Sequence, residues 1–257
     1  MDKIMGQTES RERFFTKDRE FYRTLFKMLL VVALQNLVAY SVNMADNIML
    51  GVYDQASLSA AATVNQVFFM VQQFALSIGN ALVVLGAQYW GQGRVEPVRT
   101  LTGIALKLGV LISAALVGVC ALFPEPLLYL FTDSAEIVAE GVRYLSLIQW
   151  TFALFILTNV LMAALRSVGV VNISFYVSVV SLIVNAGINY TLIFGRFGFP
   201  ELGILGAAVG TLTARTLEFV VVLAYILKWD KKLCLFSGGG VWRRDKCLRG
   251  DYAKVYI

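Results

Sequence analysis

The chain has 257 residues and a mean hydropathy of +0.70; 58% of its residues are hydrophobic and only 15% are charged. In soluble domains about a quarter of the residues are charged, so this composition indicates an integral membrane protein. The chain is long enough for about six membrane-spanning helices. The sequence holds no histidine, which excludes a histidine metal site and a Ser-His or Cys-His catalytic pair. The basic residues behind the net charge of +5 lie mostly beside the apolar runs, a pattern typical of membrane proteins and not of nucleic-acid binding.

Six apolar stretches follow one another at about 28–52, 61–88, 101–123, 142–165, 171–195 and 203–227. We therefore expect an all-α, multi-pass protein of the cell (cytoplasmic) membrane with six transmembrane helices. The first apolar run is too long for a cleaved signal peptide, so the first helix is retained. The chain divides into a basic N-terminal segment (1–22), a six-helix lobe (23–232) and a polar tail (233–257) that we interpret as truncated or frame-shifted.

Lysine and arginine residues are concentrated on one side of the predicted spans. They fill the N-terminal flank, occur in the second and fourth connections, and follow the last span, whereas the first connection has none and the third is rich in acidic residues. Cytoplasmic loops carry the excess of basic residues in membrane proteins. We therefore expect both termini in the cytoplasm, as an even number of spans requires.

Polar side chains gather at one depth in the predicted bundle. At about 1.5 Å of rise per residue, Asp46 and Asn189 lie roughly 9 Å below the outer boundary, Asn185 roughly 15 Å and Thr211 roughly 12 Å. An ionisable residue inside a span is by default a functional candidate, although the asparagines alone could serve as interhelical hydrogen bonds. This layer could bind a proton or a small hard cation such as Na⁺, with Asp46, Asn185 and Asn189 as ligands, and we expect no other metal.

Two further sets of polar residues predict a water-filled cavity, with hydrogen bonding between helices as the alternative. The candidate lining residues are Gln35, Asn36, Asn43 and Asn47 in the first span, and Gln66, Gln73 and Asn80 in the second.

The last span carries small residues and one charged pair. Gly203, Gly206 and Gly210 predict close helix packing. Arg215 and Glu218 are three residues apart, which predicts either an ion pair within the helix or a gate.

Several motifs together resemble the N-terminal half of a multidrug and toxic-compound extrusion (MATE) transporter over roughly residues 20–232. They are LQNLVAYSVNMADNIMLG, AQYWGQG, FPEPLLYLFT, ALRSVG, NAGINYTLIFGRFGFPELGILGAAVGT and TARTLEF. The resemblance implies a secondary antiporter that expels drugs or organic cations in exchange for H⁺ or Na⁺. It also implies that Asp46 is the coupling residue of the N-lobe, with Asn185, Asn189 and Thr211 around it. Asn189 stands where some members have a second acid.

The family has about twelve spans in two six-helix lobes, so the resemblance implies a missing C-terminal lobe or a second copy of this chain as partner. Two alternatives stay open: an inactive, truncated half-transporter, and a flippase of lipid-linked sugars, which would need clustered Arg or Lys residues in the cavity. A membrane-embedded enzyme is disfavoured, because Asp46 with asparagines offers no nucleophile or metal pair. We expect no cofactor beyond the coupling ion.

Overall fold

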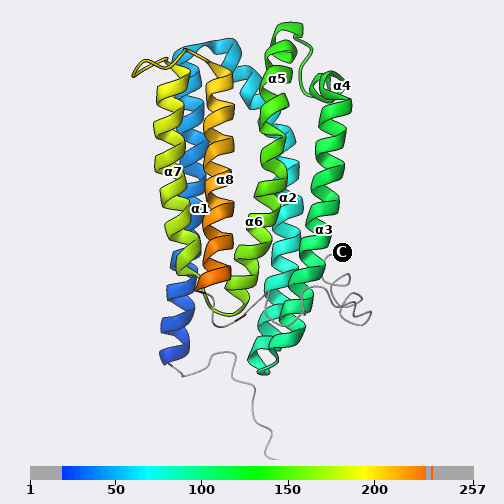
Figure 1. The fold of residues 1–257 in the computed structure, drawn as a ribbon, viewed down its shortest axis with the longest axis vertical. Helices are drawn as coiled ribbons and strands as arrows, with labels where there is room; N and C mark the ends of the chain where they lie inside the picture. The colour runs from blue at the N-terminus through cyan, green and yellow to red at the C-terminus, as the bar shows by residue number, and fades with distance from the viewer. Residues whose placement is uncertain (1–18, 230–232, 234–257) are drawn as a thin grey trace, which may run out of the picture.

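The computed structural model describes residues 19–229 and Leu233, and it forms one bundle of helices (Figure 1). No strand occurs among these residues. The helices in chain order are α1 (Arg19–Tyr53), α2 (Gln55–Gly91), α3 (Val95–Leu122), α4 (Pro124–Tyr129), α5 (Ala135–Ile148), α6 (Trp150–Ser167), α7 (Asn172–Ile193) and α8 (Ile204–Lys228).

Six of the described helices are long and apolar enough to cross a membrane: α1, α2, α3, α6, α7 and α8. This confirms the predicted all-α class and the number of spans. The fourth span differs from its prediction, because α5 precedes α6 with only Gln149 between them. The predicted stretch at about 142–165 therefore covers the second half of α5, whose first turn is capped by Ser134, together with most of α6.

The spans pack into a bundle with α6 as its most enclosed member. α6 lies against α2, α3 and α8, while α7 lies against α1 and α8. Large side chains such as Phe152 and Ile156 of α6 are fully buried there. The start of α1 and the end of α8 lie at the same end of the bundle, as an even number of spans requires (Figure 1).

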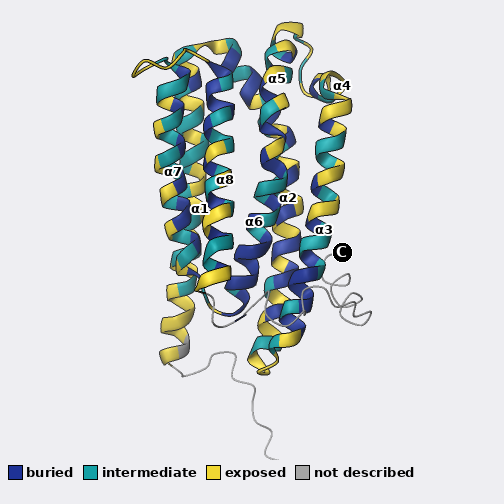
Figure 2. Cartoon of the chain, in the orientation of Figure 1, coloured by how far each residue is buried: buried dark blue, intermediate teal, exposed yellow. Residues whose placement is uncertain are grey.

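Many large apolar side chains are exposed, as expected for a surface that faces lipid. Figure 2 shows exposed residues along the length of the helices. α1 is the least enclosed span, since Leu50 is its only buried residue among those described. A helix with few buried contacts separates from its neighbours at a lower cost than a helix in the core.

Most of the two predicted terminal segments, 1–22 and 233–257, lies outside the described residues. Leu233 is an exception: it is buried, and its carbonyl accepts a hydrogen bond from Arg99 Nε at 2.6 Å. This contact attaches the exit of α8 to α3.

Candidate functional site

A cavity of about 170 Å³ lies between α1, α2, α5, α6, α7 and α8. The predicted residues of α1 belong to its wall: Gln35, Asn36, Asn43 and Asn47. The predicted residues of α2 do not, because Gln66, Gln73 and Asn80 are exposed and lie outside this wall.

α2 instead contributes Asn65 and Gln72 to the cavity. Each precedes a predicted residue by one position, and one position turns a helix by about 100°. The seven-residue spacing thus correctly predicts that polar residues of α2 share one helical face, but it does not predict whether that face points into the cavity.

Four of the predicted site residues form one hydrogen-bonded chain across three helices. The Asn189 amide donates to Asp46 Oδ1 at 2.6 Å and to Asn185 Oδ1 at 3.4 Å. The Asn185 amide in turn donates to Thr211 Oγ1 at 3.3 Å. Both asparagines are fully buried, so the chain links α1, α7 and α8 inside the bundle.

Gly210 of α8 makes room for this chain. Asn189 Oδ1 has no hydrogen-bond partner and points at Gly210, where a Cβ atom would overlap it and would lie 2.9 Å from Asn189 Cγ. Gly206, one turn earlier, allows close helix packing as predicted, since a Cβ there would lie 2.7 Å from the carbonyl carbon of Leu192. Gly210 therefore positions a site residue in addition to admitting a neighbouring helix.

A polar stripe along α7 leads to the site, and the sequence interpretation missed it. Its members recur at intervals of three or four residues and are all buried: Ser174, Ser178, Ser181, Asn185 and Asn189. Such intervals place side chains on one helical face, which was the available signal. Serine often bonds to the backbone of its own helix in a membrane span, so serines indicate a binding site less clearly than asparagines do.

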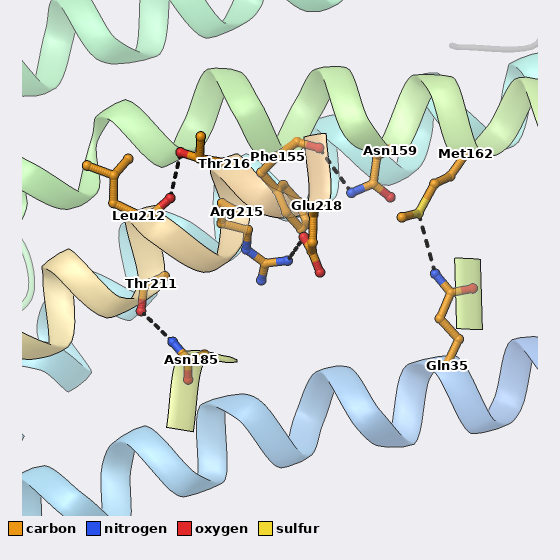
Figure 3. A network of polar contacts seen from close by, with 10 residues as sticks. All are labelled: Gln35, Phe155, Asn159, Met162, Asn185, Thr211, Leu212, Arg215, Thr216 and Glu218. Carbon is orange, nitrogen blue, oxygen red and sulfur yellow. Dashed lines mark hydrogen bonds and ion pairs between the residues drawn. The ribbon is translucent and has the colours of Figure 1, made fainter. Parts of the chain in front are cut away.

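The charged pair of α8 also lies in this cavity. Arg215 donates to Glu218 Oε2 at 2.8 Å, and its guanidinium lies 4.9 Å from the centre of the Phe155 ring (Figure 3). Arg215 is the only Arg or Lys side chain among the described residues of the wall. The clustered positive charges that a flippase of lipid-linked sugars would need are therefore missing from this part of the chain.

The MatE family model matches residues 32–191. The chain belongs to the MatE family. Members of this family are transporters and not enzymes. The matched range includes three members of the polar chain, Asp46, Asn185 and Asn189, and ends before Thr211 and Arg215.

Curated relatives of this MatE-family chain are named as multidrug resistance proteins. A probable multidrug resistance protein NorM from Rhizobium meliloti (strain 1021) is 34% identical over 221 residues, which cover 86% of this chain and 47% of the relative. A probable NorM from Streptococcus pneumoniae (strain ATCC BAA-255 / R6) is 27% identical over 213 residues, 83% of this chain and 47% of the relative. The chain thus spans about half the length of the relatives it matches.

Solved structures share the fold of this MatE-family chain. One is described as an outward-facing multidrug resistance MATE family transporter of the MOP superfamily. It matches with a TM-score of 0.80 at 17% identity, and the match covers 90% of this chain and 50% of the chain in that structure. Another, a MOP superfamily transporter from Pyrococcus furiosus whose binding pocket is described as reversed in polarity, has a TM-score of 0.80 at 18% identity, with 91% and 50% covered. Both matches place the six spans in one half of a longer transporter fold.

Proposed function

We propose that this chain is the N-terminal lobe of a secondary antiporter that expels drugs or organic cations across the cytoplasmic membrane in exchange for H⁺ or Na⁺. The observation that carries the proposal is the Asp46 carboxylate, which Asn189 holds at 2.6 Å inside a polar cavity of the bundle. The names of the relatives support drugs as substrates, and the chain's half-length match supports a second lobe, or a second copy of this chain, as partner.

In the proposed mechanism the negative charge of Asp46 binds either the organic cation or the coupling ion. In a low-dielectric cavity a carboxylate attracts an organic cation strongly. Binding of the coupling ion to Asp46 neutralises that charge, so the organic cation is released outward. Release of the ion to the cytoplasm then restores the charge, and the cavity can bind another organic cation.

Movement of α1 connects this charge change to access. Asp46 lies on α1, which has Leu50 as its only buried residue in the described part, whereas Asn189 lies on the better enclosed α7. A change at the Asp46–Asn189 contact therefore acts on the span that separates most easily from the bundle. Alternating access then requires a second bundle that rocks against this one.

The orientation of Asn189 favours H⁺ as the coupling ion. Its amide nitrogen faces Asp46, and its oxygen faces Gly210. A proton can bind Asp46 without disturbing this arrangement. A Na⁺ ion needs oxygen ligands, so Asn189 would have to turn its amide over and place its nitrogen against Gly210.

An efflux assay tests the proposal. The chain is fused to the second half of the Rhizobium meliloti relative and expressed in bacteria without their own drug pumps, and ethidium efflux is followed after energisation. We expect Asp46→Asn to reduce efflux to the level of cells without the fusion protein. Asp54→Asn is the matched control, because Asp54 is an exposed carboxylate beyond the end of α1 and asparagine also caps a helix.

Efflux that is undiminished in Asp46→Asn, at equal membrane levels of both proteins, would refute the coupling role. Collapse of either the proton or the sodium gradient identifies the coupling ion. The same assay on the chain without the fused half shows whether a second copy of the chain can replace a C-terminal lobe.

A further inference from the structure

The α8 pair holds a planar cation against an aromatic face inside the cavity. Arg215 donates to Glu218 at 2.8 Å, and the side chains of the two residues are only 16% and 8% exposed. The same guanidinium lies 4.9 Å from the centre of the Phe155 ring on α6. Glu218 and Phe155 therefore contact the same positive charge, one through a carboxylate and the other through a π system.

A carboxylate beside an aromatic ring is a general recognition unit for organic cations. The ring quadrupole attracts a cation that lies over its face, and the attraction is stronger when the contact is desolvated. A charge-assisted hydrogen bond to a carboxylate stabilises such a cation further. A guanidinium is flat, and its charge is delocalised over several atoms. Planar organic cations with delocalised charge share these properties.

The pair is also part of the cavity that contains the polar chain. Arg215 follows Thr211 by four residues on α8, which places both on one face of that helix. Asp46, Thr211, Arg215 and Glu218 all line the same cavity. A ligand in this cavity can therefore reach Glu218 without crossing a packed core.

We propose that Glu218 and Phe155 form a binding site for planar, delocalised organic cations, and that Arg215 occupies this site while no such cation is bound. The inference rests on the proposed function and names the class of substrate that the cavity recognises. The cavity of about 170 Å³ is smaller than the roughly 300–1,000 Å³ of drug-sized sites, so displacement of the arginine side chain also makes room for the ligand.

A purely structural ion pair leads to the opposite expectation. If Arg215 only fastens α8 to α6, its removal leaves a buried carboxylate without a partner and loosens the bundle, so ligand binding weakens or stays the same. If Arg215 competes with the ligand, its removal strengthens binding. The sign of the change therefore separates the two explanations.

Ethidium binding to the purified 257-residue chain in nanodiscs tests the proposal by fluorescence titration. We expect Arg215→Gln to bind ethidium at least about tenfold more tightly than the wild type, and Glu218→Gln to bind it at least about tenfold more weakly. Another i,i+3 pair in the described part of the chain supplies the control: Glu140 and Arg143 on α5 form an ion pair of 2.9 Å at the surface. Glu140→Gln and Arg143→Gln should leave ethidium binding unchanged.

A folding control and a competition experiment accompany the titration. Size-exclusion chromatography establishes which variants fold, and if Arg215→Gln does not, the titration of Glu218→Gln decides. Displacement of ethidium by benzamidine, a planar cation, should exceed displacement by benzylamine, a compact ammonium. Unchanged or weaker binding in folded Arg215→Gln, or unchanged binding in Glu218→Gln, overturns the proposal.

The binding result is independent of the efflux result. If Asp46→Asn leaves efflux intact while Arg215→Gln still strengthens ethidium binding, the coupling role fails and the cation site stands. If Asp46→Asn abolishes efflux while neither α8 variant changes binding, the cation site fails and the antiport proposal stands.

Discussion

The substitution Gly210→Ala should damage the candidate site through a single methyl group. A Cβ atom at this position overlaps Asn189 Oδ1 and lies 3.3 Å from Ile188 Cγ2. Asn189 is fully buried and is held by Asp46 and Asn185, so its amide has no free direction in which to move. Either α7 and α8 separate, or the hydrogen bond between Asn189 and Asp46 breaks.

The magnitude follows from opposing contributions. Overpacking costs about 1–3 kcal/mol, and loss of a hydrogen bond to a charged group costs roughly 1.5–3 kcal/mol. Alanine regains up to about 1 kcal/mol, because it is a better helix former than glycine. Since either cost alone follows from the substitution, we expect Gly210→Ala to lower the free energy of unfolding by about 1–3 kcal/mol.

Equilibrium unfolding of the purified chain in mixed micelles measures this change. Gly187→Ala is the matched control, because Gly187 lies on α7, and no atom beyond its own helix and chain neighbours lies within 4 Å of an added Cβ. It should be neutral or slightly stabilising. In a double-mutant cycle, Asn189→Ala should remove most of the steric cost of Gly210→Ala. The reasoning is refuted if Gly210→Ala is as stable as Gly187→Ala.

Two predictions concern the ends of the spans. Gly203 has φ of 53°, and a Cβ atom there would lie 2.7 Å from the Tyr53 ring, whereas Gly198 has φ of 84° and open space around it. Gly203→Ala should therefore lower the melting temperature more than Gly198→Ala does, as thermal unfolding can measure. The Ser57 backbone N–H donates to Asp54 at 2.8 Å and lowers the pKa of that carboxyl, which caps α2. The stability that the Asp54 carboxylate contributes is therefore fully present above the unfolded pKa of about 3.9. It is lost as the pH falls through the lowered pKa of the folded state. Asp54→Ala should accordingly lower the melting temperature at pH 7, and the difference from the wild type should shrink below about pH 4; a difference that persists undiminished there contradicts the assignment.

The layer of site residues was predictable from the sequence because depth in a membrane depends on position along a helix. The sequence places Asp46, Asn185 and Thr211 within a few residues' rise of one another. In the structure Asn189 connects Asp46 with Asn185, and Asn185 bonds directly to Thr211. A fixed rise per residue and a fixed direction for each span suffice for that result. The proton or sodium role of these residues stays a prediction.

The direction of each helical face was not predictable in the same way. Asn65 and Gln72 face the cavity, while Gln66 and Gln73, one position later, are exposed. Both pairs have the same spacing and the same chemistry, so the pattern of α2 does not distinguish them. The choice depends on which side of α2 meets its neighbours, and that is decided by the packing of the whole bundle.

An all-α membrane protein with six spans and a carboxylate in the first of them follows from the sequence, because hydropathy, span length and charge distribution are properties of local segments. The packed bundle is needed to show that Gly210 shapes the surroundings of Asn189 and that Arg215 lies over Phe155. These are contacts between helices that lie far apart in the sequence or that turn toward each other only after packing. They depend on how the helices pack against one another, which no local pattern of residues specifies.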